Sequence, residues 1–169
     1  MEAERLIATG RHELAEARVV LDIVVEAWQA QALAQAIGSQ LALCGPLELR
    51  SEARGLSETS GGRATVEHPA LRGGGPRAAR LTAVTDARAA LTALGALLGE
   101  VGIALVGVAC ATDEEGLYWQ CIEAIDAADE AGDRVRAMLR RLAVRDRERA
   151  RDRPPDPARG RAGPTAGPR

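Results

Sequence analysis

The chain of 169 residues contains no phenylalanine, no lysine and no asparagine. Because Trp28, Tyr118 and Trp119 are its only aromatic residues, alanine, leucine and valine must fill any hydrophobic core. Small aliphatic side chains favour helices that approach one another closely over a bulky globular interior. Since 46% of the residues are hydrophobic, the chain has enough apolar material for one such core.

Cysteine is also scarce, and no signal peptide is evident at the start of the chain. Cys44, Cys110 and Cys121 are odd in number and form no CxxC pair, which argues against a disulfide framework. Residues 1–10 are charged and lack the apolar core of a signal peptide. We therefore expect a cytoplasmic protein whose cysteines are buried, inert thiols.

Residues that commonly carry catalysis or hold metals are absent or poorly placed. The only histidines, His12 and His68, have no glutamate three residues before them, so the Glu-x-x-His motif of metal-binding bundles is missing. The glycine run 73–75 has no Lys, Ser or Thr after it to complete a phosphate loop. The acidic residues of 123–133 lie mostly opposite the expected core, which favours a solvated face over a metal site. We expect no enzyme, no cofactor, no metal and no cleft for a small-molecule substrate.

Two consecutive apolar heptad seams dominate the second half of the chain. Steps of three and four residues place each seam along one side of an α-helix. The first seam consists of Val84, Ala87, Leu91, Leu94, Leu98, Val101, Leu105 and Val108. The second seam consists of Tyr118, Cys121, Ile125, Ala128, Gly132, Val135, Leu139 and Leu142. Two such stripes joined by a short link predict an antiparallel helical hairpin over 77–148.

The rest of the chain predicts an all-α fold around this hairpin, an elongated bundle of three long helices and one short helix. The expected helices are 2–43, 46–55, 77–110 and 113–148. We expect the bundle domain to cover 1–148, with a loop over 57–76 inside it and a disordered Arg/Pro/Gly-rich tail over 149–169.

Local signals refine these expectations. Gly10 is expected to fray or bend the first helix, and Gly55 to end the short helix in a left-handed cap. Thr112 or Asp113 is expected to cap the last helix. The connection 45–76 is long enough to allow either direction of the first helix relative to the third, and we favour an antiparallel arrangement.

The stretch 93–111 is long and apolar enough to cross a membrane, with Glu100 as its one charge. Glu100 would then lie near the middle of the membrane, at a cost of about 3 kcal/mol. Because Glu100 lies two residues past Leu98, it can face water while the seam remains buried. We therefore favour a buried helix of a soluble bundle and expect no membrane partner.

A further group of residues predicts an interaction surface. Trp119 lies almost opposite the seam of its helix, so either the first helix covers it or it belongs to a second face that is buried in an oligomer. Gly95 and Gly99 form a Gly-x-x-x-Gly pair that permits close helix packing. The candidate interface residues are Trp119, Ile122, Tyr118, Trp28, Gly95 and Gly99.

Charge is divided unevenly along the chain. Residues 1–133 hold 10 Arg and 20 acidic residues, a net charge of −10, whereas residues 134–169 hold 12 Arg and 4 acidic residues, a net charge of +8. A basic end of this kind could neutralise phosphates of a nucleic acid or another polyanion. However, its acidic residues alternate with the arginines and no aromatic residue is interleaved for base stacking, so this partner is the weaker expectation.

Two blocks of sequence resemble a small, uncharacterised all-helical family of Streptomyces-type actinobacteria. They are EAWQAQALAQAIGSQLA (26–42) and GEVGIALVGVACATDEEGLYWQCIEAIDAADEAGDRVRAMLRRL (99–142). The resemblance implies a bacterial cytoplasmic origin and a stable helical domain, and it implies no activity, cofactor or catalytic residue. The sequence thus predicts a non-catalytic interaction or scaffold protein that binds a protein partner or forms a homodimer, with a regulator that contacts a polyanion through its Arg-rich end as the alternative.

Overall fold

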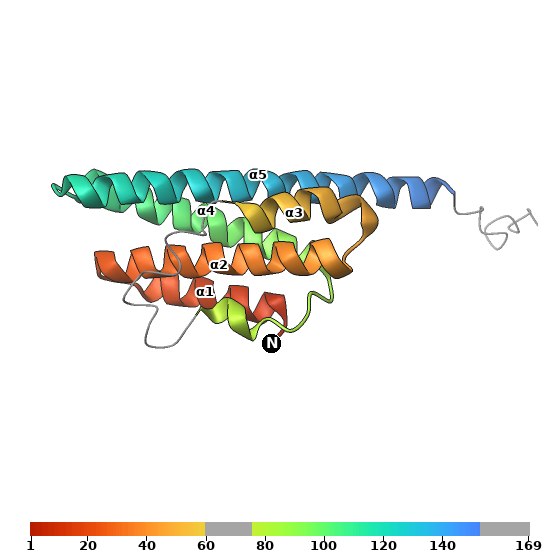
Figure 1. The fold of residues 1–169 in the computed structure, drawn as a ribbon, viewed down its shortest axis with the longest axis horizontal. Coiled ribbons are helices and arrows are strands. Elements are labelled where there is room, and N and C mark those ends of the chain that lie inside the picture. Colours follow the sequence, from red (N-terminus) through yellow and green to blue (C-terminus); the bar gives the residue numbers. More distant parts are fainter. Residues whose placement is uncertain (60–75, 153–169) are drawn as a thin grey trace, which may run out of the picture.

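The computed structural model describes residues 1–59 and 76–152, and within these ranges the chain is an all-α bundle without strands. Its helices are α1 (Ala3–Glu16), α2 (Val20–Cys44), α3 (Arg50–Glu58), α4 (Ala87–Ala111) and α5 (Glu115–Arg151), with the 3-10 turns η1 (Leu47–Leu49) and η3 (Arg77–Arg80) (Figure 1). The expected fold class is confirmed, and three of these helices are long. Most of the expected loop, including His68 and the run 73–75, and the tail from 153 onward lie outside the described residues.

Neighbouring long helices alternate in direction. The expected antiparallel hairpin is formed by α4 and α5, because Gly95 faces Val135 and Arg88 pairs with Asp146 farther along α5. The end of α2 lies beside the start of α4, so the favoured antiparallel placement of these two helices is also confirmed. α1 runs parallel to α4 and packs against both α2 and α4.

The two seams form the centre of the core. From α4, six of the eight predicted seam positions are buried: Leu91, Leu94, Leu98, Val101, Leu105 and Val108. α5 contributes Cys121, Ala128, Gly132, Val135 and Leu142 to the same interior. Tyr118, the first position of the second seam, is 40% exposed and does not join the core. The seam pattern therefore identifies most of the buried side of each helix, although Ile125 and Leu139 are only half-buried and Leu97, Ala131 and Met138 are buried outside the seams.

The single helix expected over 2–43 is wrong, because the chain turns back between α1 and α2. Val19 is extended before α2 begins, and the last turn of α1 contains acidic residues and no basic ones, which opposes the helix dipole. Folding back buries Leu6 and Ile7 in the core. Gly10 lies inside α1 at a close contact, since an added Cβ would lie 3.3 Å from the Arg77 guanidinium.

The helix expected over 77–110 begins ten residues later than predicted. Its first residues form the turn η3, and the following segment runs beside the N-terminus of the chain. The backbone amide of Ala3 donates to Ala83, and that of Thr82 donates to Met1. These hydrogen bonds satisfy the segment's backbone, and Asp86 then caps α4 by accepting from the Ala89 amide at 2.9 Å. Val84, counted in the first seam, therefore precedes the helix.

Two other expected ends shift for identifiable reasons. α3 continues through Gly55 to Glu58, so the left-handed cap is wrong; Gly55 instead leaves room for Arg134, whose guanidinium would lie 2.6 Å from an added Cβ. α5 begins at Glu115 and continues to Arg151. The expected cap at Thr112 or Asp113 is wrong, because Glu114 is the N-cap and Thr112 Oγ1 instead accepts from the Glu114 amide, at 3.1 Å, before the helix begins. The predicted start of this helix is thus correct to within two residues.

Candidate functional site: the outer face of α4 and α5

The face of α4 that points away from the bundle carries a second heptad stripe. Its residues, here called the outer stripe, are Ala89, Thr92, Ala96, Gly99, Ile103, Val106 and Cys110. All seven are exposed, none is charged, and they are separated by alternating steps of three and four. Ile103 is 76% and Val106 49% exposed. An apolar stripe with this period is what one helix presents to another.

The sequence contained a signal for the outer stripe that the seam analysis missed. Between Ala89 and Ala111 the only charged residue is Glu100, so α4 is apolar almost all round. As expected, Glu100 lies away from the seam, where its carboxylate pairs with Arg11 of α1. Because Glu100 and its partner occupy one flank, the outer stripe itself remains free of charge.

The start of α5 extends the apolar surface beside the outer stripe. Trp119 is 56% exposed, so the interpretation that another helix covers it is wrong within the described residues. Its ring packs edge-on against Tyr118, with ring centroids 5.4 Å apart. Ile125 is half-buried and borders α4, and Ile122, also half-buried, lies about one turn before it. We call the outer stripe together with these four α5 residues the outer face.

A groove joins the two parts of the outer face. Its volume is about 300 Å³, and its lining comprises Gly99, Gly102, Ile103, Val106, Ile125 and Asp129. An added Cβ at either glycine would meet no other atom within 4 Å. The glycines therefore do not serve packing inside the chain, and they leave a hollow between two helices that an external side chain could enter.

The structure separates the six predicted interface residues. Trp119, Tyr118, Ile122 and Gly99 lie on the outer face, as described above. Gly95 packs inside the hairpin, where an added Cβ would lie 3.4 Å from Val135. Trp28 is half-buried between α2 and α5, beside Ala124 and Ala127. The Gly-x-x-x-Gly pair therefore does not act as one unit.

A buried amide beside Trp28 lacks a partner. Gln31 is 5% exposed, and its Nε2 has no hydrogen-bond acceptor at a cavity of only about 10 Å³. Leaving a buried polar group unpaired costs about 1 to 3 kcal/mol. We expect Gln31→Met, which keeps the length of the side chain, to raise the free energy of unfolding by about 1 kcal/mol in urea titrations. Lower stability of Gln31→Met than of the parent would show that the amide is satisfied in solution.

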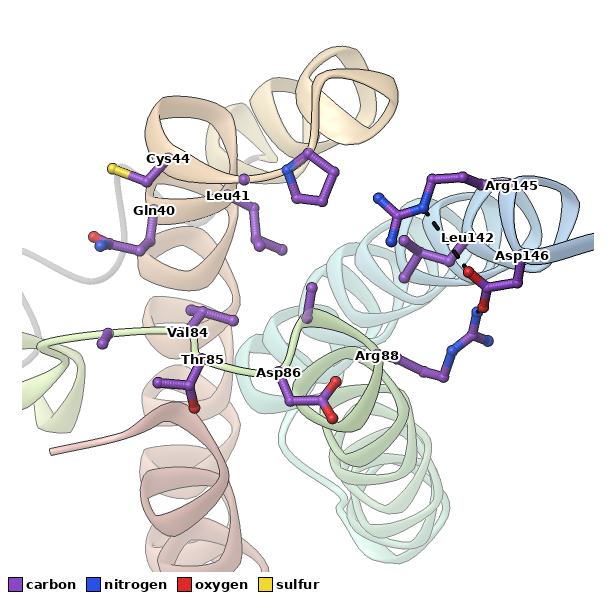
Figure 2. A pocket seen from close by; sticks show the side chains of 14 residues that line it. Gln40, Leu41, Cys44, Val84, Thr85, Asp86, Arg88, Leu142, Arg145 and Asp146 are labelled. Atoms are coloured by element: carbon purple, nitrogen blue, oxygen red, sulfur yellow. Dashed lines mark hydrogen bonds and ion pairs between the residues drawn. The ribbon is translucent and has the colours of Figure 1, made fainter. Parts of the chain in front are cut away.

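A cavity lies at the end of the bundle where α2 ends and α4 begins. It encloses about 680 Å³ above Leu41, Val84 and Leu142, so the expectation that the helices leave no cleft is wrong at this end. Figure 2 shows Arg145 reaching toward it from α5, with Asp146 between Arg145 and Arg88. A cavity of this size could hold a small molecule.

The charged groups of this cavity are engaged in interactions within the chain. Arg88 pairs with Asp146 at 2.5 Å, Arg145 pairs with Glu48 at 2.5 Å, and Asp86 caps α4. No histidine is among the residues that line it. The cavity thus offers neither a free acid–base pair nor an activated nucleophile, and its charges hold helix ends together.

Ion pairs between α3 and α5 continue from this cavity along the bundle. Glu52 accepts from Arg141 at 2.9 Å and from Arg134 at 3.4 Å, and Arg134 also lies 3.8 Å from Glu130. Together with Arg145, which pairs with Glu48, three arginines of the basic end therefore pair with carboxylates of the chain itself. Glu52 of α3 thus accepts from two arginines of α5.

Acid should weaken the contact between Glu48 and Arg145. Hydrogen bonding from the backbone amide of Glu48, with a further contribution from Arg145, lowers the pKa of Glu48 below its usual value. A carboxylate with a lowered pKa stabilises the folded state above its unfolded pKa, and this contribution is lost as the pH falls through the folded pKa. We expect Glu48→Gln to show a flatter decline of the urea midpoint than the parent below about pH 5. Parallel declines for the two proteins would contradict this assignment.

The cysteines differ in environment. Cys121 is buried, as expected, and burial raises the pKa of its thiol. Cys44 and Cys110 are exposed, so the expectation that they are buried is wrong. Both lie in the last turn of a helix, where neighbouring segments of the same chain no longer cover the helix surface. Within residues 1–59 and 76–152, no group of three His, Cys, Asp or Glu side chains is placed to hold a metal ion.

These observations define the described part of the chain as an all-α bundle with an aliphatic core and an exposed apolar face on α4 and α5. The chain belongs to a family of unknown function, DUF6099, which matches residues 1–141. The resemblance to an uncharacterised family is confirmed at this level. The matched region includes the outer face and ends within the Arg-rich part of α5. No curated protein and no solved structure matches the chain.

Proposed function

We propose that this chain is a non-catalytic, cytoplasmic interaction protein that binds a protein partner through the outer face of α4 and α5. The observation that carries the proposal is the outer stripe, a charge-free heptad repeat that is exposed along a helix whose opposite side is the core. Its helical period matches a helix better than a loop or a strand as the occupant.

The size of the exposed side chains supports this proposal. Isolated exposed apolar residues are ordinary on soluble proteins, but contiguous ones commonly mark binding surfaces. Ile103, Val106, Tyr118 and Trp119 all lie on the outer face and range from 40% to 76% exposed. Tryptophan and tyrosine are also the residues that most often dominate binding energy at interfaces.

A lipid surface is a different occupant that the apolarity of α4 could suit. By length and composition α4 could cross a membrane. However, eight of its residues are buried in the bundle, including Leu91, Leu94 and Val101. Exposing this seam to lipid would require α4 to leave α5, α2 and α1. A protein partner requires no such rearrangement, which supports it over a spanning helix.

The alternative is a regulator that contacts a polyanion through the Arg-rich end. Arg134, Arg141 and Arg145 already pair with Glu48 or Glu52, and these pairs reduce the positive charge that α5 offers to phosphates. This observation supports the interaction-protein proposal. A salt-dependent gel shift with DNA that disappears when residues 144–169 are removed would favour the alternative instead.

Photo-crosslinking in cells that make the full chain tests the proposal. A photoreactive amino acid replaces Ile103 in one variant and Leu43 in a matched control, because both side chains are 76% exposed and Leu43 lies on α2, outside the outer face. We expect a polypeptide adduct from position 103 and none from position 43. Adducts to lipid alone, equal adducts from both positions, or none from position 103 would contradict the proposal.

A further inference from the structure

We infer that the partner seated on the outer face is a second copy of this chain, with the two α4 helices packed antiparallel about a two-fold axis near Gly99. This inference rests on the proposed function and names its partner. Two features of the described residues support it independently: the order of side-chain sizes along the outer stripe and the order of charges along α5.

The outer stripe is small at one end and large at the other. Before Gly99 its residues are Ala89, Thr92 and Ala96, and after Gly99 they are Ile103, Val106 and Cys110. In an antiparallel pair, the large half of each copy lies opposite the small half of the other, and the glycine allows close approach at the centre. A parallel pair would set Ile103 against Ile103 and leave the alanines facing a gap. Because interfaces pack best when large residues meet small ones, the stripe is complementary to itself in the antiparallel orientation.

The charges of α5, like the side-chain sizes of the outer stripe, differ between the two ends of the helix. Its first half, 115–133, contains six acidic residues and no arginine, whereas its second half, 134–151, contains eight arginines and two acidic residues. Arg134, Arg141 and Arg145 pair with Glu48 or Glu52, and the other five arginines have no pairing to these two carboxylates. α5 lies along one side of the outer stripe, where Ile125 and Asp129 border the groove. In the antiparallel dimer, the two-fold axis is perpendicular to α4 and lies in the plane between the two α4 helices. Both α5 helices are then on the same side of the dimer and run antiparallel to each other. The acidic half of each α5 then lies beside the basic half of the other, which favours this pairing over a parallel one.

One pair of side chains illustrates this complementarity. Asp129 and Arg136 are seven residues apart, so they lie on the same side of α5 as Ile125, next to the outer stripe. Among residues 1–59 and 76–152, Arg136 pairs only with Asp133, three residues earlier, and both side chains are more than 60% exposed. In the antiparallel dimer, Asp129 of each copy lies toward Arg136 of the other, giving the contact twice.

The apolar area is consistent with a modest dimer interface. The four large side chains of the outer face, exposed by 40% to 76%, present on the order of 400 Å². The small residues of the outer stripe and the α5 charges beside it extend this toward the roughly 800 Å² per partner of a standard interface. We therefore expect a dissociation constant in the range of about 0.1 to 10 µM.

Light scattering coupled to size-exclusion chromatography tests the dimer directly. At about 50 µM, above the expected dissociation constant, we expect the full chain and Leu43→Glu to be mainly dimers and Ile103→Glu to be mainly a monomer, with dimerisation weakened by about 1,000-fold or more. Leu43 and Ile103 are equally exposed in one chain, so only the outer face distinguishes the two variants. A monomeric parent protein at this concentration, or a dimeric Ile103→Glu, would overturn the inference.

A second variant, Gly99→Ala, distinguishes loss of the dimer contact from loss of folding, which Ile103→Glu alone does not. Gly99→Ala adds a methyl group that meets nothing within 4 Å inside one chain and improves helix propensity. We expect it to raise the thermal midpoint of the dilute monomer and yet weaken dimerisation about tenfold, because the methyl group lies where the two helices approach most closely. Unchanged or tighter dimerisation would count against a close antiparallel contact at Gly99.

Disulfide trapping tests the orientation. In a Cys44→Ser, Cys110→Ser background, Thr92→Cys and Val106→Cys chains are mixed, allowed to exchange and oxidised. The antiparallel pair predicts the mixed 92–106 disulfide in excess over both symmetric disulfides, whereas a parallel pair predicts the reverse and would overturn the orientation. If the chain is monomeric but photo-crosslinking from position 103 captures a different protein, the dimer fails and the proposed function stands. If position 103 captures no polypeptide, both fail.

Discussion

Replacing Gly38 with alanine is expected to destabilise the bundle by about 2 kcal/mol, although alanine is the better helix former. Gly38 is buried in α2 where α3 crosses it. A Cβ built there would lie 2.8 Å from both the Ala53 carbonyl oxygen and the Ser57 amide nitrogen. These are backbone atoms of α3, so no side-chain rotation relieves the contact.

The expected magnitude follows from two opposing effects. Alanine gains about 1 kcal/mol in helix propensity, whereas overpacking a tight contact costs about 1 to 3 kcal/mol or somewhat more when backbone must move. Here α3 has to shift, and its ion pairs with α5 shift with it. Urea unfolding followed by circular dichroism measures the difference.

Gly107→Ala is the matched control for this change. Gly107 is also an interior helix glycine, but an added Cβ there meets nothing within 4 Å. We expect this variant to be more stable than the parent by up to about 1 kcal/mol. Equal effects of the two substitutions would show that α2 and α3 do not approach as closely as described.

Leu94→Ala is expected to cost about 3 kcal/mol or more, because it removes a fully buried side chain from the centre of the α4 seam. Ile103→Ala removes a similar number of carbon atoms from the opposite side of the same helix, where the side chain is 76% exposed. Measured in samples dilute enough to be monomeric, this second change should stay within about 0.5 kcal/mol.

The contrast between these two variants tests whether α4 is buried on one side only. If α4 were buried all round within one chain, both substitutions would be strongly destabilising. If α4 packed loosely against α5, Leu94→Ala would cost little. Chemical denaturation of both variants at the same low concentration distinguishes these outcomes.

Much of the fold follows from periodicity, and the exceptions have local causes. The seams predict α4 and α5 and their antiparallel pairing because each seam has only one apolar partner nearby in sequence. The break between α1 and α2 could not be read from apolar spacing, since residues on both sides of Ala17 continue one stripe. It depends on Leu6 and Ile7 reaching the core, a contact far from them in sequence. The delayed start of α4 likewise depends on hydrogen bonds between Ala83 and the N-terminus.

The candidate site, like the fold, could be predicted from the sequence only in part. Sequence alone placed Trp119 opposite the seam, and the structure shows its side chain exposed. The outer stripe was equally visible in the sequence, because two heptad patterns run along α4. The larger Leu and Val side chains of the seam identify it as the buried stripe, and the structure confirms this burial. Contacts of α4 with α1, α2 and α5 provide it. Trp28 lies apart from the outer face, beside Ala124 and Ala127, which are too small to signal this contact in the sequence. Its role at an interface stays a prediction.

The account depends most on the outer face of α4 being a contact surface, and residue-level footprinting tests this claim directly. The full chain is labelled with a photoactivated carbene reagent once in cells and once as a dilute purified protein. We expect labelling of Ile103 and Val106 to fall several-fold in cells, with Leu43 and Leu47, which are 76% and 75% exposed, labelled equally in both settings. Equal labelling of all four residues in both settings would contradict the account.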